Sequence, residues 1–190
     1  MFIKKLFIVV LVMGYSRSVV VELGNKLLRT AVRKGSIGEV KELVEHASDE
    51  DKSLALVIAA EKQKFDTAQV LLSLEGTNIN GVDQHGYTAF DYFLASALRP
   101  NCKEAQVEGC VALMASLINK GYKIPENKEA KNRILLLAAM QGHLELIEEL
   151  YNAGADVNSN FFLYGTPLNV AREKGHTDVC NALTRMGAKG

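Results

Sequence analysis

The sequence predicts an all-α fold built from stacked pairs of short helices, and three observations indicate it. The chain of 190 residues is 48% apolar and 23% charged, with no Trp and only three Pro, a composition that favours a globular helical protein. Apolar residues recur at intervals of three and four in stretches such as "ELIEELYNAG", which is one face of a helix. The third observation is an internal period of 33 residues near the C-terminus.

The period is visible in "GHLELIEEL" and "GHTDVCNAL", where it separates His143 from His176. Each stretch reads Gly-His-x-acid, so each alone resembles half of a metal site or a proton-transfer pair. The interval of 33 residues joins six identical pairs: Ala138 and Ala171, Gly142 and Gly175, His143 and His176, Leu150 and Leu183, Gly154 and Gly187, Ala155 and Ala188. We therefore interpret both histidines as markers of a repeated unit, a helix, a turn at Gly and a second helix ended by Gly, and we predict no metal site.

Two short motifs give the repeat a family. Residues 165–168 read "GTPL", and Gly154–Asn158 read "GADVN". With the Gly-His turn and the 33-residue period, these motifs resemble the ankyrin repeat, most closely over residues 126–158 and 159–190. The resemblance implies an all-α ankyrin-repeat solenoid of helix–turn–helix units with short β-finger hairpins, in which each helix pair buries its apolar face against the next.

Earlier parts of the chain follow the same pattern with more drift. The small residue of the inner helix falls at Ala31, Ala59, Ala138 and Ala171, and Phe93 stands in its place in the third unit. The expected units are residues 21–50, 51–82, 83–125, 126–158 and 159–190. The first is short by about one finger, and the third carries an insertion near 96–109, where Pro100-Asn101 predicts a turn. We expect this insertion to be a loop available for binding, or a tolerated disordered segment.

Helix ends have their own signals in the predicted repeats. Thr166 before Pro167 is typical of an N-cap followed by Pro at the first helical position, and Thr88 is expected to cap a helix without the Pro. Gly154 and Gly187 are expected to adopt the left-handed conformation that ends a helix.

The N-terminal residues 1–18 are predicted to be a secretory signal peptide. Two lysines in "MFIKK" precede the apolar run "LFIVVLVM", and "GYSRS" supplies small residues for cleavage after Ser16 or Ser18. The run is far shorter than the roughly 20 residues that span a bilayer. Two alternatives remain: a buried or interfacial helix, and an uncleaved membrane anchor. The predicted location is accordingly periplasmic or secreted, or membrane-anchored if cleavage does not occur.

Catalysis and cofactors have little support in the sequence. No nucleotide-binding, nucleophile-elbow or His-Glu-x-x-His motif occurs, so we predict a non-enzyme without a cofactor. Cys180 is expected to be a buried apolar residue, and the rival hypothesis is a thiol enzyme that uses it. Cys102 and Cys110 lack the C-x-x-C spacing of a zinc site. If the protein is exported, a disulfide between these two cysteines is one alternative.

The predicted function is binding of another protein. The 22 basic residues equal the 22 acidic ones, which gives no electrostatic reason to bind nucleic acid, and we expect a monomer. The resemblance implies contact through finger tips and the exposed ends of inner helices. The candidates are Gln84, His85, Tyr87, Met140, Gln141, Phe161, Phe162, Tyr164, Glu173 and Lys174. The run Phe161–Tyr164 is the most notable because exposed aromatic residues are favoured in interfaces, although two of its members are equally expected to pack under the neighbouring finger.

Overall fold

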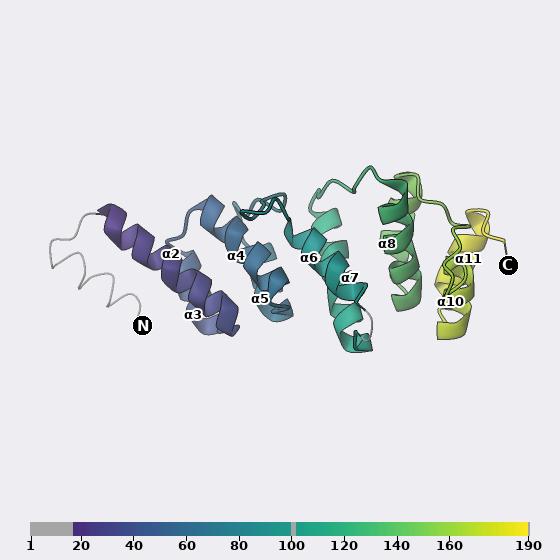
Figure 1. Ribbon diagram of the computed structural model, residues 1–190, viewed down its shortest axis with the longest axis horizontal. Helices are drawn as coiled ribbons and strands as arrows, with labels where there is room; N and C mark the ends of the chain where they lie inside the picture. Colours follow the sequence, from purple (N-terminus) through teal and green to yellow (C-terminus); the bar gives the residue numbers. More distant parts are fainter. Residues whose placement is uncertain (1–16, 100–101, 190) are drawn as a thin grey trace. The chain divides into compact units, whose positions relative to one another are not determined.

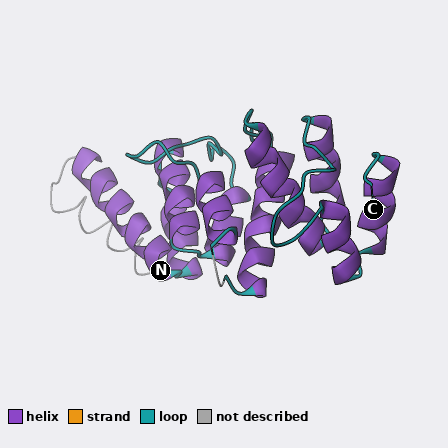
Figure 2. Ribbon diagram, turned by 45° about the vertical axis from the view of Figure 1, so that its right-hand side comes forward, coloured by secondary structure: helices purple, strands orange, loops and turns teal. Residues whose placement is uncertain are grey.

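The computed structural model describes residues 17–99 and 102–189, which form ten helices (Figure 1). They are α2 (Arg17–Lys34), α3 (Ile37–Val44), α4 (Asp49–Glu61), α5 (Phe65–Leu72), α6 (Ala89–Ala97), α7 (Glu104–Asn119), α8 (Lys128–Gln141), α9 (Leu144–Asn152), α10 (Pro167–Lys174) and α11 (Thr177–Arg185). Within the described ranges the extended structure is limited to two isolated antiparallel bridges, and Figure 2 shows helices joined by loops. The all-α prediction is confirmed.

The predicted signal peptide, residues 1–18, lies outside the described residues except for Arg17 and Ser18, which begin α2. None of the helices in the described part of the chain has both the length and the apolar character needed to cross a membrane.

The chain divides into two compact units, of which the first ends at Phe93. Within it α2 packs against α3 and α4, and α5 packs against α3 and α4, so that two helix pairs are stacked. Ala31 and Ala59 are at most 1% exposed. Phe93, which replaces the small residue of the third repeat, is fully buried and stacks on Phe65 of α5 with ring centroids 6.4 Å apart. The third repeat therefore has a buried aromatic residue, stacked on Phe65, at the position where the other repeats have alanine.

The second unit begins at Leu94. In it α8 packs against α7, α9 and α10, while α11 packs against α9 and α10. Ala138 and Ala171 are fully buried, and so are the outer-helix residues Leu150 and Leu183. The same apolar positions that revealed the 33-residue period thus form the core, because a helix pair cannot bury its apolar face without a neighbour.

Turns and caps follow the expected chemistry. Thr166 Oγ1 accepts a hydrogen bond from the Asn169 N–H, and Thr88 Oγ1 accepts one from the Asp91 N–H at the start of α6. Gly154 and Gly187 have φ of 88° and 93°, the left-handed conformation predicted for them. The turn between α4 and α5 uses Gln63 at φ 54°, where Gly35, Gly142 and Gly175 stand in the equivalent turns of three other repeats.

The expected insertion near 96–109 is a loop only in part, since residues 98–99 and 102–103 lie between α6 and α7. Residues 104–109 form the first turns of α7, which runs for 16 residues, whereas the other outer helices have eight or nine. Val107 and Cys110 are buried, which places this extension in the core of the second unit. The turn signal at Pro100-Asn101 itself falls on residues outside the described ranges. The loop prediction was wrong for residues 104–109, because this part of the extra length adds a helical segment that packs through Val107, which spacing alone does not reveal.

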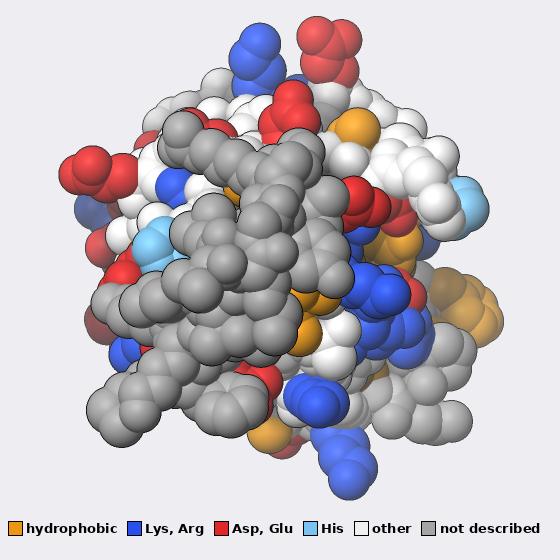
Figure 3. All heavy atoms as spheres, turned by 90° about the vertical axis from the view of Figure 1, so that its left-hand side faces the viewer, with side chains coloured by type: hydrophobic (Ala, Val, Ile, Leu, Met, Phe, Trp, Pro, Cys, Tyr) orange, Lys and Arg blue, Asp and Glu red, His pale blue; other side chains and the backbone are white. Residues whose placement is uncertain are grey.

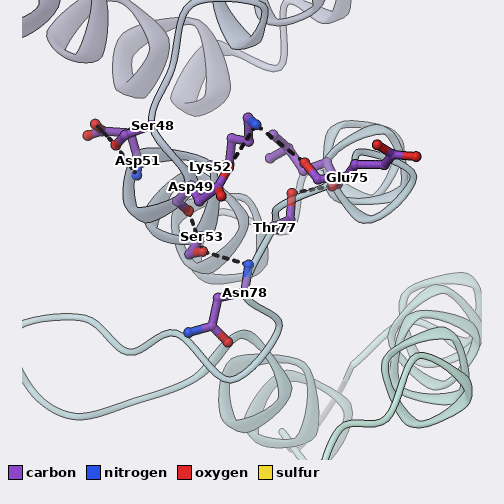
Figure 4. Close-up of polar contacts among 9 residues, drawn as sticks. Ser48, Asp49, Asp51, Lys52, Ser53, Glu75, Thr77 and Asn78 are labelled. Carbon is purple, nitrogen blue, oxygen red and sulfur yellow. Dashed lines mark hydrogen bonds and ion pairs between the residues drawn. The ribbon is translucent and has the colours of Figure 1, made fainter.

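In the inner helices α4 and α8, a side chain from the N-terminal half of the helix bonds to the loop that follows the outer helix of the same repeat. The Asn78 N–H donates to Ser53 Oγ at 2.8 Å in the first unit (Figure 4), and the Asp156 N–H donates to Asn132 Oδ1 at 2.8 Å in the second. Ser53 is buried, and its hydroxyl in turn donates to the Asp49 carbonyl. These bonds fix the loops from which the two fingers extend.

Candidate binding surfaces

The first finger, residues 82–88, is held in shape by one carboxylate. Asp83 Oδ1 accepts hydrogen bonds from the backbone N–H groups of His85 and Tyr87, and Asp83 Oδ2 accepts one from the Tyr92 hydroxyl at 2.7 Å. The hydrogen bond from Tyr92 holds the pKa of Asp83 below its ordinary value, and the same bond raises the pKa of Tyr92 to about 12. The finger is therefore fixed around an ionised Asp83 at neutral pH.

The predicted contact residues of this finger lie on its outside. Gln84, His85 and Tyr87 are all exposed, and the Tyr87 ring stands edge-on to the Tyr92 ring with centroids 5.8 Å apart. Sequence reasoning did not assign a role to Asp83 or Tyr92. The signal was available in "DQHGYTAF", since Asp commonly accepts bonds from the backbone two residues on.

A groove runs beside the finger in the first unit, between α2 and α4. It consists of two adjoining hollows of about 610 and 390 Å³, which share Arg29 and Leu54 in their walls. The remaining lining residues are Asp49, Glu50, Asp51, Ser53, Asn78, Asn80, Gly81 and Val82 in the larger hollow, and Arg33, Ile58, Glu61, Lys62, Asp83, Gln84, His85 and Tyr92 in the smaller. Two of the predicted contact residues, Gln84 and His85, thus belong to a concave surface.

The end of the groove formed by the start of α4 is rich in polar contacts (Figure 4). Ser48 caps α4 by accepting from the Asp51 N–H, and Lys52 bridges Asp49 to the Glu75 carbonyl. Arg29 of α2 reaches Asp51 at 3.2 Å. Figure 3, which faces the α2 end of this unit, shows one group of Lys and Arg side chains and, around it, basic and acidic side chains interspersed.

The second finger exposes an apolar tip. Phe162, Leu163 and Tyr164 are 102%, 79% and 52% exposed, whereas Phe161 is only partly exposed and bridges to Gly165. The Phe161 N–H donates to the Gly165 carbonyl at 2.9 Å, and the Gly165 N–H donates back to the Phe161 carbonyl. Of the two alternatives for this run, exposure therefore holds for its last three residues.

The other predicted contacts lie at the ends of α8 and α10. Met140 and Gln141 are half-buried, and the Met140 carbonyl lies 3.1 Å from Nε2 of His176. Glu173 and Lys174 are exposed, and Lys174 forms an ion pair with Glu104 at the start of α7, which lowers the pKa of Glu104. These residues do not join the second finger in one cluster of contacts.

The two marker histidines occupy the N-cap positions of α9 and α11. The His176 ring lies over Gly142, the turn glycine of the preceding repeat, and bonds to that turn through Met140. Within the described ranges no group of three or more His, Cys, Asp or Glu side chains is arranged to hold a metal ion. The His176 ring therefore packs between two successive turns.

Protonation of His143 is expected to destabilise the protein. Burial lowers the pKa of His143, an effect that Glu108 and Glu145 partly offset. The unfolded chain therefore binds the proton more tightly, so stability is complete above the ordinary pKa of about 6.5 and falls as the pH drops below it. Denaturant titrations between pH 7.5 and 5 are expected to show a smaller loss for His143→Gln than for the original protein. Equal slopes would contradict this assignment.

All three cysteines are free thiols. Cys110 is fully buried, and burial raises the pKa of its thiol to about 12, which keeps it protonated. Cys180 is half-buried, so its predicted place in the core was wrong: the core stripe of α11 is Val179, Ala182 and Leu183, and Cys180 lies at its edge. Within the described residues, no basic side chain forms a hydrogen bond with the Cys180 thiol. The backbone carbonyl of Cys180 accepts a hydrogen bond from the Thr184 hydroxyl.

Comparison with known families agrees with the geometry. Residues 102–189 match the family model for ankyrin repeats, in three copies. Residues 102–189 therefore consist of ankyrin repeats. Ankyrin repeats are modules that bind other proteins and typically lack enzymatic activity, and the stacked helix pairs with projecting fingers have that architecture. Among curated proteins, no match to the chain was found.

Proposed function

We propose that this ankyrin repeat protein is a non-catalytic monomer that binds one protein partner through the tip of its second finger, Phe162–Tyr164. The observation that carries the proposal is the exposure of three consecutive large apolar side chains. An isolated exposed apolar residue is ordinary, but a contiguous group is typical of an interface. Aromatic side chains supply large contact areas with little loss of conformational freedom.

The finger is held ready for binding. Its bridge between Phe161 and Gly165 closes the tip, and Thr166 then caps α10, whose first residues Pro167 and Leu168 are buried. The tip is thereby anchored on both sides to the core of the second unit. A rigid apolar tip binds with less ordering cost than a flexible one, which supports its use as a contact.

Replacing Phe162 and Leu163 together with Ser is expected to abolish partner binding without unfolding the protein. Both side chains are at least 79% exposed, so their loss removes little packing within the chain. Loss of two central contacts is expected to weaken binding by about 30-fold or more. The partner is first captured on the immobilised protein from the native compartment, identified and purified, and its affinity is then measured for each variant. Size-exclusion chromatography with light scattering measures the oligomeric state and is expected to show a monomer.

Tyr151→Ser provides the matched control for this experiment. Tyr151 lies on α9 in the same unit and is 41% exposed, but it is not part of the finger. The control is expected to bind as the original protein does. Unchanged binding by the Phe162→Ser, Leu163→Ser variant would exclude the finger, and a lower thermal transition would show that its side chains support the fold. Phe161 is left intact because it is partly buried.

The export of the protein is a further part of the proposal. It is supported by the basic start, the short apolar run and the small residues of the predicted signal peptide. Intact mass measurement of the protein recovered from its native host is expected to show cleavage after Ser16 or Ser18. An intact N-terminus in the membrane fraction would favour the tethered adaptor instead.

A further inference from the structure

The groove of the first unit is polar along its length and has opposite charge at its two ends. Its larger hollow contains Asp49, Glu50 and Asp51 from the first turn of α4, with Arg29 as its basic residue. Its smaller hollow contains the basic residues Arg29, Arg33 and Lys62 beside His85, against the two acidic residues Glu61 and Asp83. The groove therefore runs from an acidic end to a basic end along α4.

Most of these charges are already neutralised within the protein. Arg29 pairs with Asp51, Lys52 with Asp49, and Lys62 with Glu61. Asp83 is occupied by the two backbone N–H groups and the Tyr92 hydroxyl described above.

Two charges in the groove remain uncompensated, one at each end. Glu50 and Arg33 are both exposed, and neither forms an ion pair or side-chain hydrogen bond within the described residues. Because both line the groove, they are available to charges on a molecule lying in it.

The walls between these charges suit a peptide backbone. Asn80 and Gln84 are exposed and carry side-chain amides, which offer both donors and acceptors. Leu54, which is half-buried, and Ile58, which is buried, supply an apolar floor on α4. A groove with polar side chains in its walls and only two apolar residues in its floor fits an extended chain better than a compact apolar ligand.

The length of α4 sets the spacing of the partner's charges. Lys62, the C-cap of α4, lines the smaller hollow together with Arg33, and the rise of about 1.5 Å per residue places it about 18 Å along the helix from Glu50. An extended peptide rises about 3.3 Å per residue, so the same length takes about five residues.

We propose that this groove binds an extended segment of another protein in which an acidic and a basic residue lie about five residues apart. The acidic residue pairs with Arg33, and the basic residue pairs with Glu50. The inference rests on the proposed function as a protein-binding module but assigns a second surface, separate in chemistry from the apolar finger. Charge complementarity at both ends fixes the direction in which the segment lies.

The test is a selection of random 12-residue peptides displayed on phage, with the full chain immobilised. Selected peptides are expected to be enriched in acid–base pairs four to six residues apart. Their affinity, measured by fluorescence anisotropy with synthetic peptides, is expected to fall about tenfold or more for Arg33→Glu. Replacing the peptide's acidic residue with Lys is expected to restore binding to that variant.

Lys34→Glu is the matched control, since it makes the same charge change on the next residue of α2, outside the groove. It is expected to change the affinity less than about twofold. Selection of no peptides with this charge spacing, or equal effects of Arg33→Glu and Lys34→Glu, would overturn the proposal. Peptides lost only with the Phe162→Ser, Leu163→Ser variant would overturn it while leaving the finger as the binding surface. Retained peptide binding by the finger variant with loss for Arg33→Glu would separate the two surfaces.

Discussion

Replacing Phe93 with Ala is expected to lower the free energy of unfolding by about 3–5 kcal/mol, the usual cost of removing a buried phenyl ring. Phe93 is fully buried and stacks on Phe65, with an angle of 28° between the two rings. Alanine is the residue that this repeat position otherwise carries, so a comparison of sequences alone would judge the change harmless. The structure predicts a cavity instead, because the neighbouring helices are spaced for the larger side chain.

Denaturant unfolding followed by circular dichroism measures this effect. Phe162→Ala is the control, since it removes the same ring from a fully exposed site and is expected to change the free energy of unfolding by less than about 0.5 kcal/mol. A loss below about 1.5 kcal/mol for Phe93→Ala would mean that the surrounding helices close around alanine. In that case the aromatic residue is a tolerated variant of the repeat and does not set the spacing.

Replacing Gly142 with Ala is expected to cost more than the same change at Gly175, although both residues occupy the same place in successive repeats. Both are left-handed, with φ of 76° and 78°, so each replacement carries the strain of about 1–2 kcal/mol for a side chain in that conformation. A methyl group on Gly142 would also lie 2.8 Å from Nδ1 of His176, whereas nothing lies within 4 Å of one on Gly175. The His176 ring would have to move and give up its contact with the Met140 carbonyl, which adds about 1 kcal/mol.

The same two changes in a His176→Ala background test the cause. Without the imidazole ring, Gly142→Ala and Gly175→Ala are expected to cost the same, so the excess at Gly142 appears as a coupling energy in a double-mutant cycle. Additive effects of Gly142→Ala and His176→Ala would show that the ring is not the obstacle. The experiment therefore measures how strongly the Gly-His motif connects one repeat to the next.

The repeat pattern in the sequence predicted which residues lie in the fingers, but it did not predict which of them are exposed or that a groove lies beside the first finger. Once the period assigned Phe162 and Tyr164 to a finger, their proximity was certain, but their exposure was not, because a finger residue can pack under its neighbour. The groove was harder still to predict. Arg33 and Glu50 are 17 positions apart in the sequence, and they share a groove only because α2 and α4 stack. Asp83 illustrates a third kind of omission, since its role depends on Tyr92 nine residues away.

The sequence by itself determined the architecture: the 33-residue identities, the helical spacing of apolar residues and the turn glycines together admit stacked helix pairs, and the observed helices agree. These signals are local or periodic, so they survive without knowledge of neighbours. Only the tertiary structure decided that residues 104–109 extend α7, that Phe93 fills a core position, and that Cys180 lies at the edge of its helix stripe. Each of these depends on which surface the adjacent repeat covers. Whether a residue is buried depends on which residues pack against it, and the sequence lists the residues without saying which of them meet.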